Sequence, residues 1–113
     1  MTRSSPHRLL RHIAAWLACA ALGAASPALQ ASPALAGKNG CMGCHAAATA
    51  LVGPAYRGVA ARYAGQAGAL QTVTDNIRKG GAGRWGDIPM PPQPQLSESD
   101  ARRLAAWILG GAK

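Results

Sequence analysis

Two cysteines and a histidine lie together at residues 41–45, which read Cys-Met-Gly-Cys-His. This spacing is the signature of covalent haem attachment, in which two thiols add to vinyl groups and the adjacent imidazole binds the iron. Cys41 and Cys44 are about one helical turn apart, so both can reach one porphyrin edge while His45 lies under the metal. The pentapeptide therefore predicts a covalently bound c-type haem.

Two other kinds of site also use a Cys-x-x-Cys pair. A redox dithiol belongs to a strand-helix-strand unit, and no such pattern surrounds residues 41–44. A structural zinc site needs four ligands, usually Cys or His, whereas the chain beyond residue 31 contains only Cys41, Cys44 and His45 of these types. Haem is therefore the favoured interpretation, and zinc and dithiol chemistry are the minor alternatives.

The first 31 residues have the composition of a secretory signal peptide. Three arginines lie among the first twelve residues, and residues 13–25 form an uncharged run, rich in Ala and Leu, that is short for a permanent transmembrane helix. We expect cleavage after Ala31, with Ala25 and Ala36 as alternative sites. The expected division is a signal peptide at 1–31 and one domain at 32–113.

Two alternatives concern this leader. Cys19 follows Leu-Ala as in a lipoprotein site, but it lies inside the hydrophobic run, with Trp16 where the processing motif prefers Leu. Retention as an uncleaved anchor is the second alternative. Cleavage after export implies a haem protein on the outer side of a bacterial inner membrane, so we expect a periplasmic protein without a permanent membrane span.

The composition sets the size and charge of the expected mature protein. The formal charge of +8 falls to +5 when the three leader arginines are removed. A modestly basic protein can be steered to an acidic patch on a protein partner, whereas no run of Lys and Arg indicates nucleic acid. A hydrophobic core is marginal in a domain of this size, and a covalent haem adds apolar surface to it. We expect a monomer.

Hydrophobic periodicity predicts an all-α domain without strands. The expected helices are 32–39, 54–63, 67–79 and a last helix that follows Ser97. Ser97 with Asp100 resembles a capping box, and Leu96 is placed as a hydrophobic staple. The expected buried positions are Leu70, Val73, Thr74 and Ile77 in the third helix and Ala101, Leu104, Ala105 and Ile108 in the last.

A proline-rich loop carrying Met90 separates the third and last helices. Four prolines within residues 89–94 prevent a helix and leave a stiff, extended segment. Beyond the leader, the only other methionine is Met42, which lies inside the attachment motif and cannot reach the opposite haem face. A loop Met usually serves packing, but a haem without a second His needs a sixth ligand. Met90 is the candidate, and His/Met ligation suits an electron carrier because it raises the reduction potential and closes the iron to small molecules.

Several segments together resemble the short bacterial class I cytochromes c of the cytochrome c-551 type. The similar segments are 41–45, 52–56, 64–69, 85–86 and 88–92. The resemblance covers nearly all of 32–113 and implies the class I cytochrome c fold, four to five short helices around one covalently bound haem c. It also implies that His45 and Met90 are the axial ligands and that the Pro54 carbonyl accepts a hydrogen bond from the His45 ring. By the same resemblance, Trp85 would donate a hydrogen bond to a haem propionate, and Trp107 would pack in the contact between the terminal helices.

The chain departs from the family pattern at three positions. Gln93 stands where the family commonly has an Asn that donates to the Met sulfur, and Ala36 replaces a usual Phe. Asn76 occupies the place of a basic residue that often neighbours a propionate. Arg78 or Arg84 could substitute for it, although we interpret both as solvated surface charges.

The function implied is that of a periplasmic one-electron carrier between respiratory redox complexes. Family membership implies donors such as a bc-type complex and acceptors such as a nitrite reductase or terminal oxidase, and no enzymatic activity of its own. The alternatives are a haem peroxidase or gas-binding sensor, which needs a distal site that can be vacated, and a structural subunit of a larger oxidoreductase. The expected docking face has an apolar centre and a basic rim. It comprises Ala46, Ala47, Val52, Ile88 and Pro91, ringed by Arg57, Arg62 and Arg84.

Overall fold

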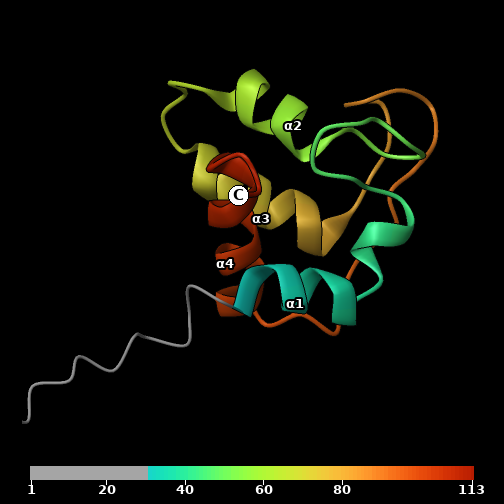
Figure 1. The fold of residues 1–113 in the computed structure, drawn as a ribbon, viewed down its shortest axis with the longest axis vertical. Helices are drawn as coiled ribbons and strands as arrows, with labels where there is room; N and C mark the ends of the chain where they lie inside the picture. Colours follow the sequence, from blue (N-terminus) through green and yellow to red (C-terminus); the bar gives the residue numbers. More distant parts are fainter. Residues whose placement is uncertain (1–30) are drawn as a thin grey trace, which may run out of the picture.

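Figure 1 shows the computed structural model, which describes residues 31–113; residues 1–30, with nearly all of the expected signal peptide, lie outside the described part. The described chain forms four α-helices and one short 3-10 helix. They are α1 (Ala31–Lys38), η1 (Cys41–Gly43), α2 (Tyr56–Tyr63), α3 (Ala69–Lys79) and α4 (Glu98–Leu109). The prediction of an all-α domain with four to five short helices is confirmed.

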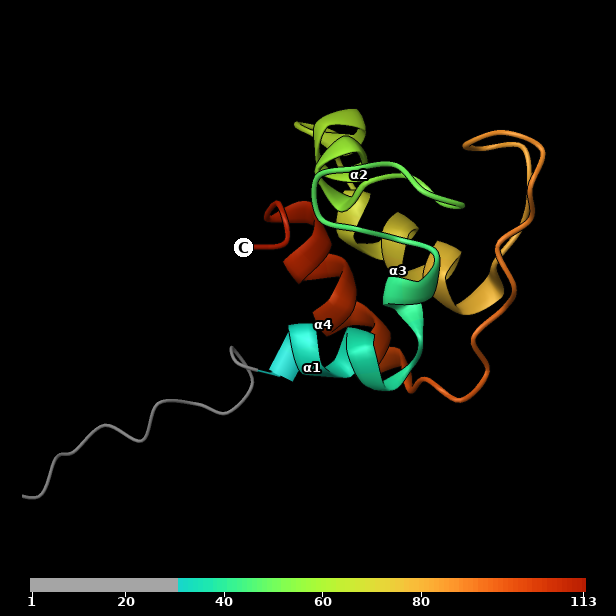
Figure 2. The same cartoon turned by 45° about the vertical axis from the view of Figure 1, so that its right-hand side comes forward.

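Helix α4 is the centre of the fold and packs against α3, α2 and α1 (Figures 1 and 2). All four positions expected to be buried on α4 are buried, with Ala101 and Ala105 fully enclosed. On α3, Val73, Thr74 and Ile77 are buried, whereas Leu70 is only partly covered. Burial of one apolar stripe from each helix accounts for most of the stability of such short helices, because isolated helices of this length are marginal in water.

The aromatic contact of Trp107 is with α2. Its ring meets that of Tyr56 edge to face, with 5.4 Å between ring centres, and its Nε1–H donates to the Lys113 carbonyl at 3.2 Å. Tyr56 is itself buried, so the two rings join the last helix to the segment that follows the attachment motif.

The start of α4 agrees with the capping pattern in the sequence. The Ser97 hydroxyl accepts a hydrogen bond from the Asp100 backbone N–H at 3.0 Å, and Leu96 is buried beside this end of the helix. This cap satisfies one of the N–H groups that a helix start leaves without an intrahelical partner.

Helices α2 and α3 each begin two residues later than predicted. The backbone N–H groups of Tyr56 and Arg57 donate to the Ala46 and Ala47 carbonyls, both at 3.0 Å, so the preceding loop supplies partners for the start of α2. Gly68 has a φ of 76°, in the left-handed region, so the right-handed α3 begins only after it.

Two long loops complete the fold. The segment between η1 and α2 and the segment between α3 and α4 lie on the same side of the helices (Figures 1 and 2). An isolated antiparallel bridge between Gly81 and Met90 is the only β-type pairing among residues 31–113. No helix in this range is long and apolar enough to cross a membrane.

Candidate haem-binding site

The attachment motif folds into one tight turn. Cys41 begins the 3-10 helix η1, and its carbonyl accepts hydrogen bonds from the N–H groups of Cys44 at 3.2 Å and His45 at 3.0 Å. Gly40, with a φ of 72°, provides the left-handed residue that turns the chain from α1 into this helix. One turn therefore gathers both thiols and the imidazole.

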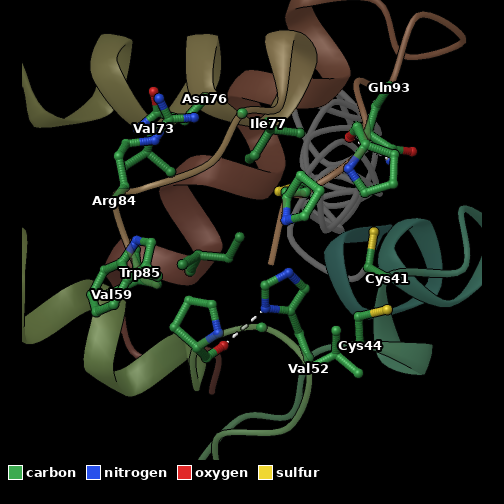
Figure 3. A pocket seen from close by; sticks show the side chains of 18 of the residues that line it. Cys41, Cys44, Val52, Val59, Val73, Asn76, Ile77, Arg84, Trp85 and Gln93 are labelled. Atoms are coloured by element: carbon green, nitrogen blue, oxygen red, sulfur yellow. Dashed lines mark hydrogen bonds between the residues drawn. The ribbon is translucent and has the colours of Figure 1, made fainter. Parts of the chain in front are cut away.

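A hydrogen bond at one of its two ring nitrogens fixes the imidazole of His45. Its Nδ1 lies 2.8 Å from the Pro54 carbonyl oxygen, shown as a dashed line in Figure 3. A carbonyl can only accept, so the proton is on Nδ1 and Nε2 carries a lone pair that can bind a metal. The ring also stacks on Tyr56, with 5.2 Å between ring centres.

Gly53 gives the His45 ring its space. A methyl group built on Gly53 would lie only 2.4 Å from Cε1 of the ring. The Gly53 N–H donates to the Cys44 carbonyl at 2.8 Å, which ties this loop directly to the attachment turn. The Gly-Pro pair thus orients the imidazole: Gly53 by its missing side chain and Pro54 by its carbonyl.

The loop that carries Met90 is closed by its backbone. Gly81 and Met90 exchange two hydrogen bonds, of 3.0 and 2.8 Å. Gly80 lies so close to this pairing that a Cβ on it would be 2.3 Å from the Met90 carbonyl oxygen, so only glycine fits there. Prolines on either side of Met90 restrict the backbone further. The position of Met90 is therefore well defined.

The two loops and the helices between them enclose one cavity of about 270 Å³. The residues with potential haem chemistry that line it are Cys41, Cys44, His45, Pro54, Trp85 and Met90. Apolar side chains from α2, α3 and α4 complete the wall, among them Val59, Ile77 and Leu104. Two thiols, an imidazole with a free nitrogen and a thioether around one apolar cavity are a donor set that fits a covalently attached haem.

Figure 3 shows that the cavity has two chemically different sides. Cys41 and Cys44 lie on one side, and Asn76, Arg84 and Trp85 lie on the opposite side. The thiols therefore face a wall that carries N–H donors.

The remaining polar residues of the cavity have partners within the protein. The Gln93 side chain donates to the Pro91 carbonyl at 3.1 Å and accepts from Gln95 at 2.7 Å. Asn76 donates to the Tyr63 hydroxyl at 3.3 Å. The Gln93 amide thus joins residues of its own loop, and the Asn76 amide joins α3 to α2.

Burial affects the two ionisable groups on the thiol side. Cys41 is half-buried, and this burial raises the pKa of its thiol. Burial likewise raises the pKa of the neighbouring Tyr56 hydroxyl, and the proximity of Cys41 adds to the increase. Both groups are therefore neutral at physiological pH, which suits an apolar wall.

Sequence reasoning did not predict three contacts at or beside this site. Gly53 makes the close approach to His45, Tyr56 stacks on the same ring, and the Arg62 guanidinium lies 4.4 Å from the centre of the Trp85 ring. The Gly-Pro pair was a usable signal for the first, but the other two contacts join segments whose sequences carry no mark of them. No group of three or more His, Cys, Asp or Glu residues within 31–113 could hold a metal ion by itself, so a zinc site finds no support there.

Comparisons with known proteins agree with this geometry. The family model for cytochrome c matches residues 29–112. Cytochrome c-551 of Azotobacter vinelandii is 53% identical over 71 residues, which are 63% of this chain and 85% of that protein. Cytochrome c-552 of Nitrosomonas europaea is 46% identical over 80 residues, 71% of this chain and 78% of that protein. The crystal structure of wild-type N. europaea cytochrome c552 superimposes with a TM-score of 0.68 at 44% identity, covering 70% of this chain and 98% of that one.

The chain therefore belongs to the cytochrome c family, as a class I monohaem cytochrome of the c-551 type. Its cofactor is one covalently bound haem c, and its function is that of an electron carrier. The class predicted from the sequence is confirmed.

Proposed function

We propose that this cytochrome is a periplasmic one-electron carrier that attaches its haem through Cys41 and Cys44 and binds the iron through His45 and Met90. The observation that carries this proposal is the shared cavity: the attachment turn and the Met90 loop, far apart in the sequence, line the same space. The haem supplies an iron that alternates between the ferric and ferrous states. The leader at 1–31 supports the periplasm as the location.

His45 would hold the haem iron through its Nε2 atom. The Pro54 carbonyl, 2.8 Å from Nδ1, holds the proton on that nitrogen, so that Nε2 would be free to bind the iron. Such a hydrogen bond also raises the basicity of the ligand and prevents rotation of the ring. Pro54 therefore acts on the metal through the imidazole.

Met90 would hold the iron through its thioether sulfur. Its loop is closed by the backbone pair with Gly81 and stiffened by prolines, so little reorganisation is expected when the iron changes charge. A thioether ligand raises the reduction potential and occupies the position that oxygen or peroxide would need. On the opposite side of the cavity from the thiols, Trp85 is the proposed hydrogen-bond donor to a haem propionate.

The alternative function, a peroxidase or gas sensor, requires a sixth ligand that leaves readily. The closed and proline-rich Met90 loop argues against this, because the backbone pairing with Gly81 keeps Met90 at the cavity.

We further propose that electrons enter and leave through an apolar face formed by the two loops. Leu51, Val52 and Ile88 are large apolar side chains that are more than half exposed there. Exposed positive charge is supplied by Arg57 and Arg62 on α2 and by Arg84 in the second loop. Such a face suits brief contact, as a monomer, with acidic partners such as a bc-type complex and a nitrite reductase or terminal oxidase.

Replacement of Met90 tests the proposed ligation. The ferric protein should show the weak far-red charge-transfer band of a sulfur-to-iron bond, and Met90→Ala should abolish it, lower the reduction potential and admit carbon monoxide or cyanide. Met42→Ala is the matched control, because Met42 is exposed and lies within the attachment turn. Rapid binding of carbon monoxide by the unmodified protein at neutral pH would favour the sensor or peroxidase instead.

A further inference from the structure

Two arginines converge on the loop that carries Met90. Arg62, on α2, places its guanidinium 4.4 Å from the centre of the Trp85 ring and donates to the Arg84 carbonyl. The Arg84 side chain folds back over the start of its own loop, where it donates to the Gly80 carbonyl at 2.5 Å. A Cβ on Gly81 would lie 2.9 Å from the same guanidinium, so the glycine makes room for it. Arg84 therefore has a defined place at the wall of the cavity.

Neither arginine is neutralised by a carboxylate of the described chain. The ion pairs among residues 31–113 join Lys79 to Asp75 and Arg103 to Asp100. Asp87, in the same loop as Arg84, is exposed and takes part in neither pair. Each guanidinium has five N–H donors, of which the structure uses few. Such a place is suited to an anion.

The position of this charge relative to the thiols identifies the anion. Arg84 and Trp85 lie across the cavity from Cys41 and Cys44 (Figure 3). A haem carries its two vinyl groups on one half of the porphyrin and its two carboxylates on the other. When the thiols hold the vinyl half, the carboxylates face the side of the cavity that carries Arg84.

We propose that Arg84, held in place by the contacts of Arg62 with its loop, is the counter-ion of a haem carboxylate. This inference deepens the proposed function and rests on it. It replaces the interpretation of Arg84 as a solvated charge, and it assigns to a loop residue the positive charge that Asn76 on α3 does not supply. Charge-assisted hydrogen bonds from a guanidinium to a carboxylate are stronger than neutral ones and fix the geometry of both groups.

The reduction potential of the haem-loaded protein tests this role. A positive charge at the haem edge favours the ferrous state, so Arg84→Gln should decrease the equilibrium constant for reduction by about 3- to 10-fold. Arg84→Lys, which keeps the charge, should restore most of this loss. Arg102→Gln is the matched control: Arg102, on α4, is exposed and does not line the cavity, so screening should limit its effect to less than about twofold.

A second measurement uses the unmodified protein and does not depend on the stability of any variant. In ¹⁵N-resolved NMR spectra, the Nε–H of Arg84 should exchange slowly with water and change its shift between the ferric and ferrous states, unlike that of Arg102. An equal loss of potential in Arg84→Gln and Arg102→Gln, or an Arg84 signal that behaves like that of Arg102, would overturn the proposal. If Arg84→Gln alters only the salt dependence of electron transfer to a partner and leaves the potential unchanged, Arg84 serves the docking face alone and the proposal is wrong. Failure of the proposed function is a separate result, since no covalent haem would then be found.

Discussion

Replacement of Gly53 by alanine should destabilise the protein through the ring of His45. The added methyl group would lie 2.4 Å from Cε1 and 2.8 Å from Nδ1 of the ring, and the first distance is more than 1 Å shorter than an ordinary carbon–carbon contact of about 3.5–4.0 Å. The backbone of Gly53 is not in the left-handed region, so alanine is conformationally allowed and the cost is steric. Overpacking of this kind costs about 1–3 kcal/mol, and loss of the bond between Nδ1 and the Pro54 carbonyl adds about 1 kcal/mol.

Gly58→Ala is the matched control, because the same methyl group has the opposite effect there. Gly58 lies within α2, and nothing is within 4 Å of a Cβ built on it. Alanine in a helix interior is more favourable than glycine by about 0.5–1 kcal/mol. Gly53→Ala should therefore be less stable than Gly58→Ala by about 2.5–5 kcal/mol, the sum of these terms.

Guanidinium and thermal unfolding of the haem-loaded ferric protein, followed by circular dichroism and by the haem absorbance, measure the difference in stability between the two variants. At about 4–8 °C per kcal/mol for a domain of this size, the thermal midpoints should differ by at least about 10 °C. The His45 ring resonances should also move in Gly53→Ala and stay in place in Gly58→Ala. Equal stability of the two variants would refute the close approach of Gly53 to the imidazole.

Three further outcomes are expected. The mature protein should weigh about one haem more than its polypeptide and keep its haem in acidified organic solvent, because both thiols are consumed as thioethers; mass spectrometry checks this, and extractable haem contradicts it. Electron transfer to an acidic partner should slow as salt increases, and Ala47→Glu should slow it at constant salt. Stopped-flow kinetics measures both effects. Rates that change with neither the salt concentration nor the substitution would place the exit of electrons on another face. Ser97→Ala should lower the free energy of unfolding by about 1 kcal/mol, because the Asp100 N–H loses its hydrogen bond to the Ser97 hydroxyl. Ser99→Ala, at the second residue of the same helix, should change this free energy far less. Similar losses for the two variants in urea denaturation would contradict a cap at Ser97.

The class of cofactor and the last helix could be predicted because both depend on residues close together in the chain. Covalent attachment needs two thiols and an imidazole at fixed spacing, and residues 41–45 provide them in one turn. The cap at Ser97 and the buried stripe of α4 also depend on residues close together in the chain, so the capping pattern and the hydrophobic periodicity predicted them correctly.

The starts of α2 and α3 were placed two residues early because other interactions decide them. The N–H groups that open α2 are satisfied by Ala46 and Ala47, in a loop that follows the attachment motif. At α3 the left-handed conformation of Gly68 ends the preceding turn, and periodicity carries no information about the sign of φ.

Residue types and motifs alone identified the candidate ligands, but only the tertiary structure decided how the site is assembled. The pairing of Gly81 with Met90, the close approach of Gly53 to His45, and the contact of Arg62 with Trp85 join segments that no local pattern connects. The physical reason is that these contacts depend on how the loops pack against the helices, whereas periodicity and motif spacing depend only on neighbours along the chain. The chemistry of residues adjacent in the chain could therefore be predicted from this sequence. The charges and close contacts around the haem-binding cavity are decided only by the folded structure.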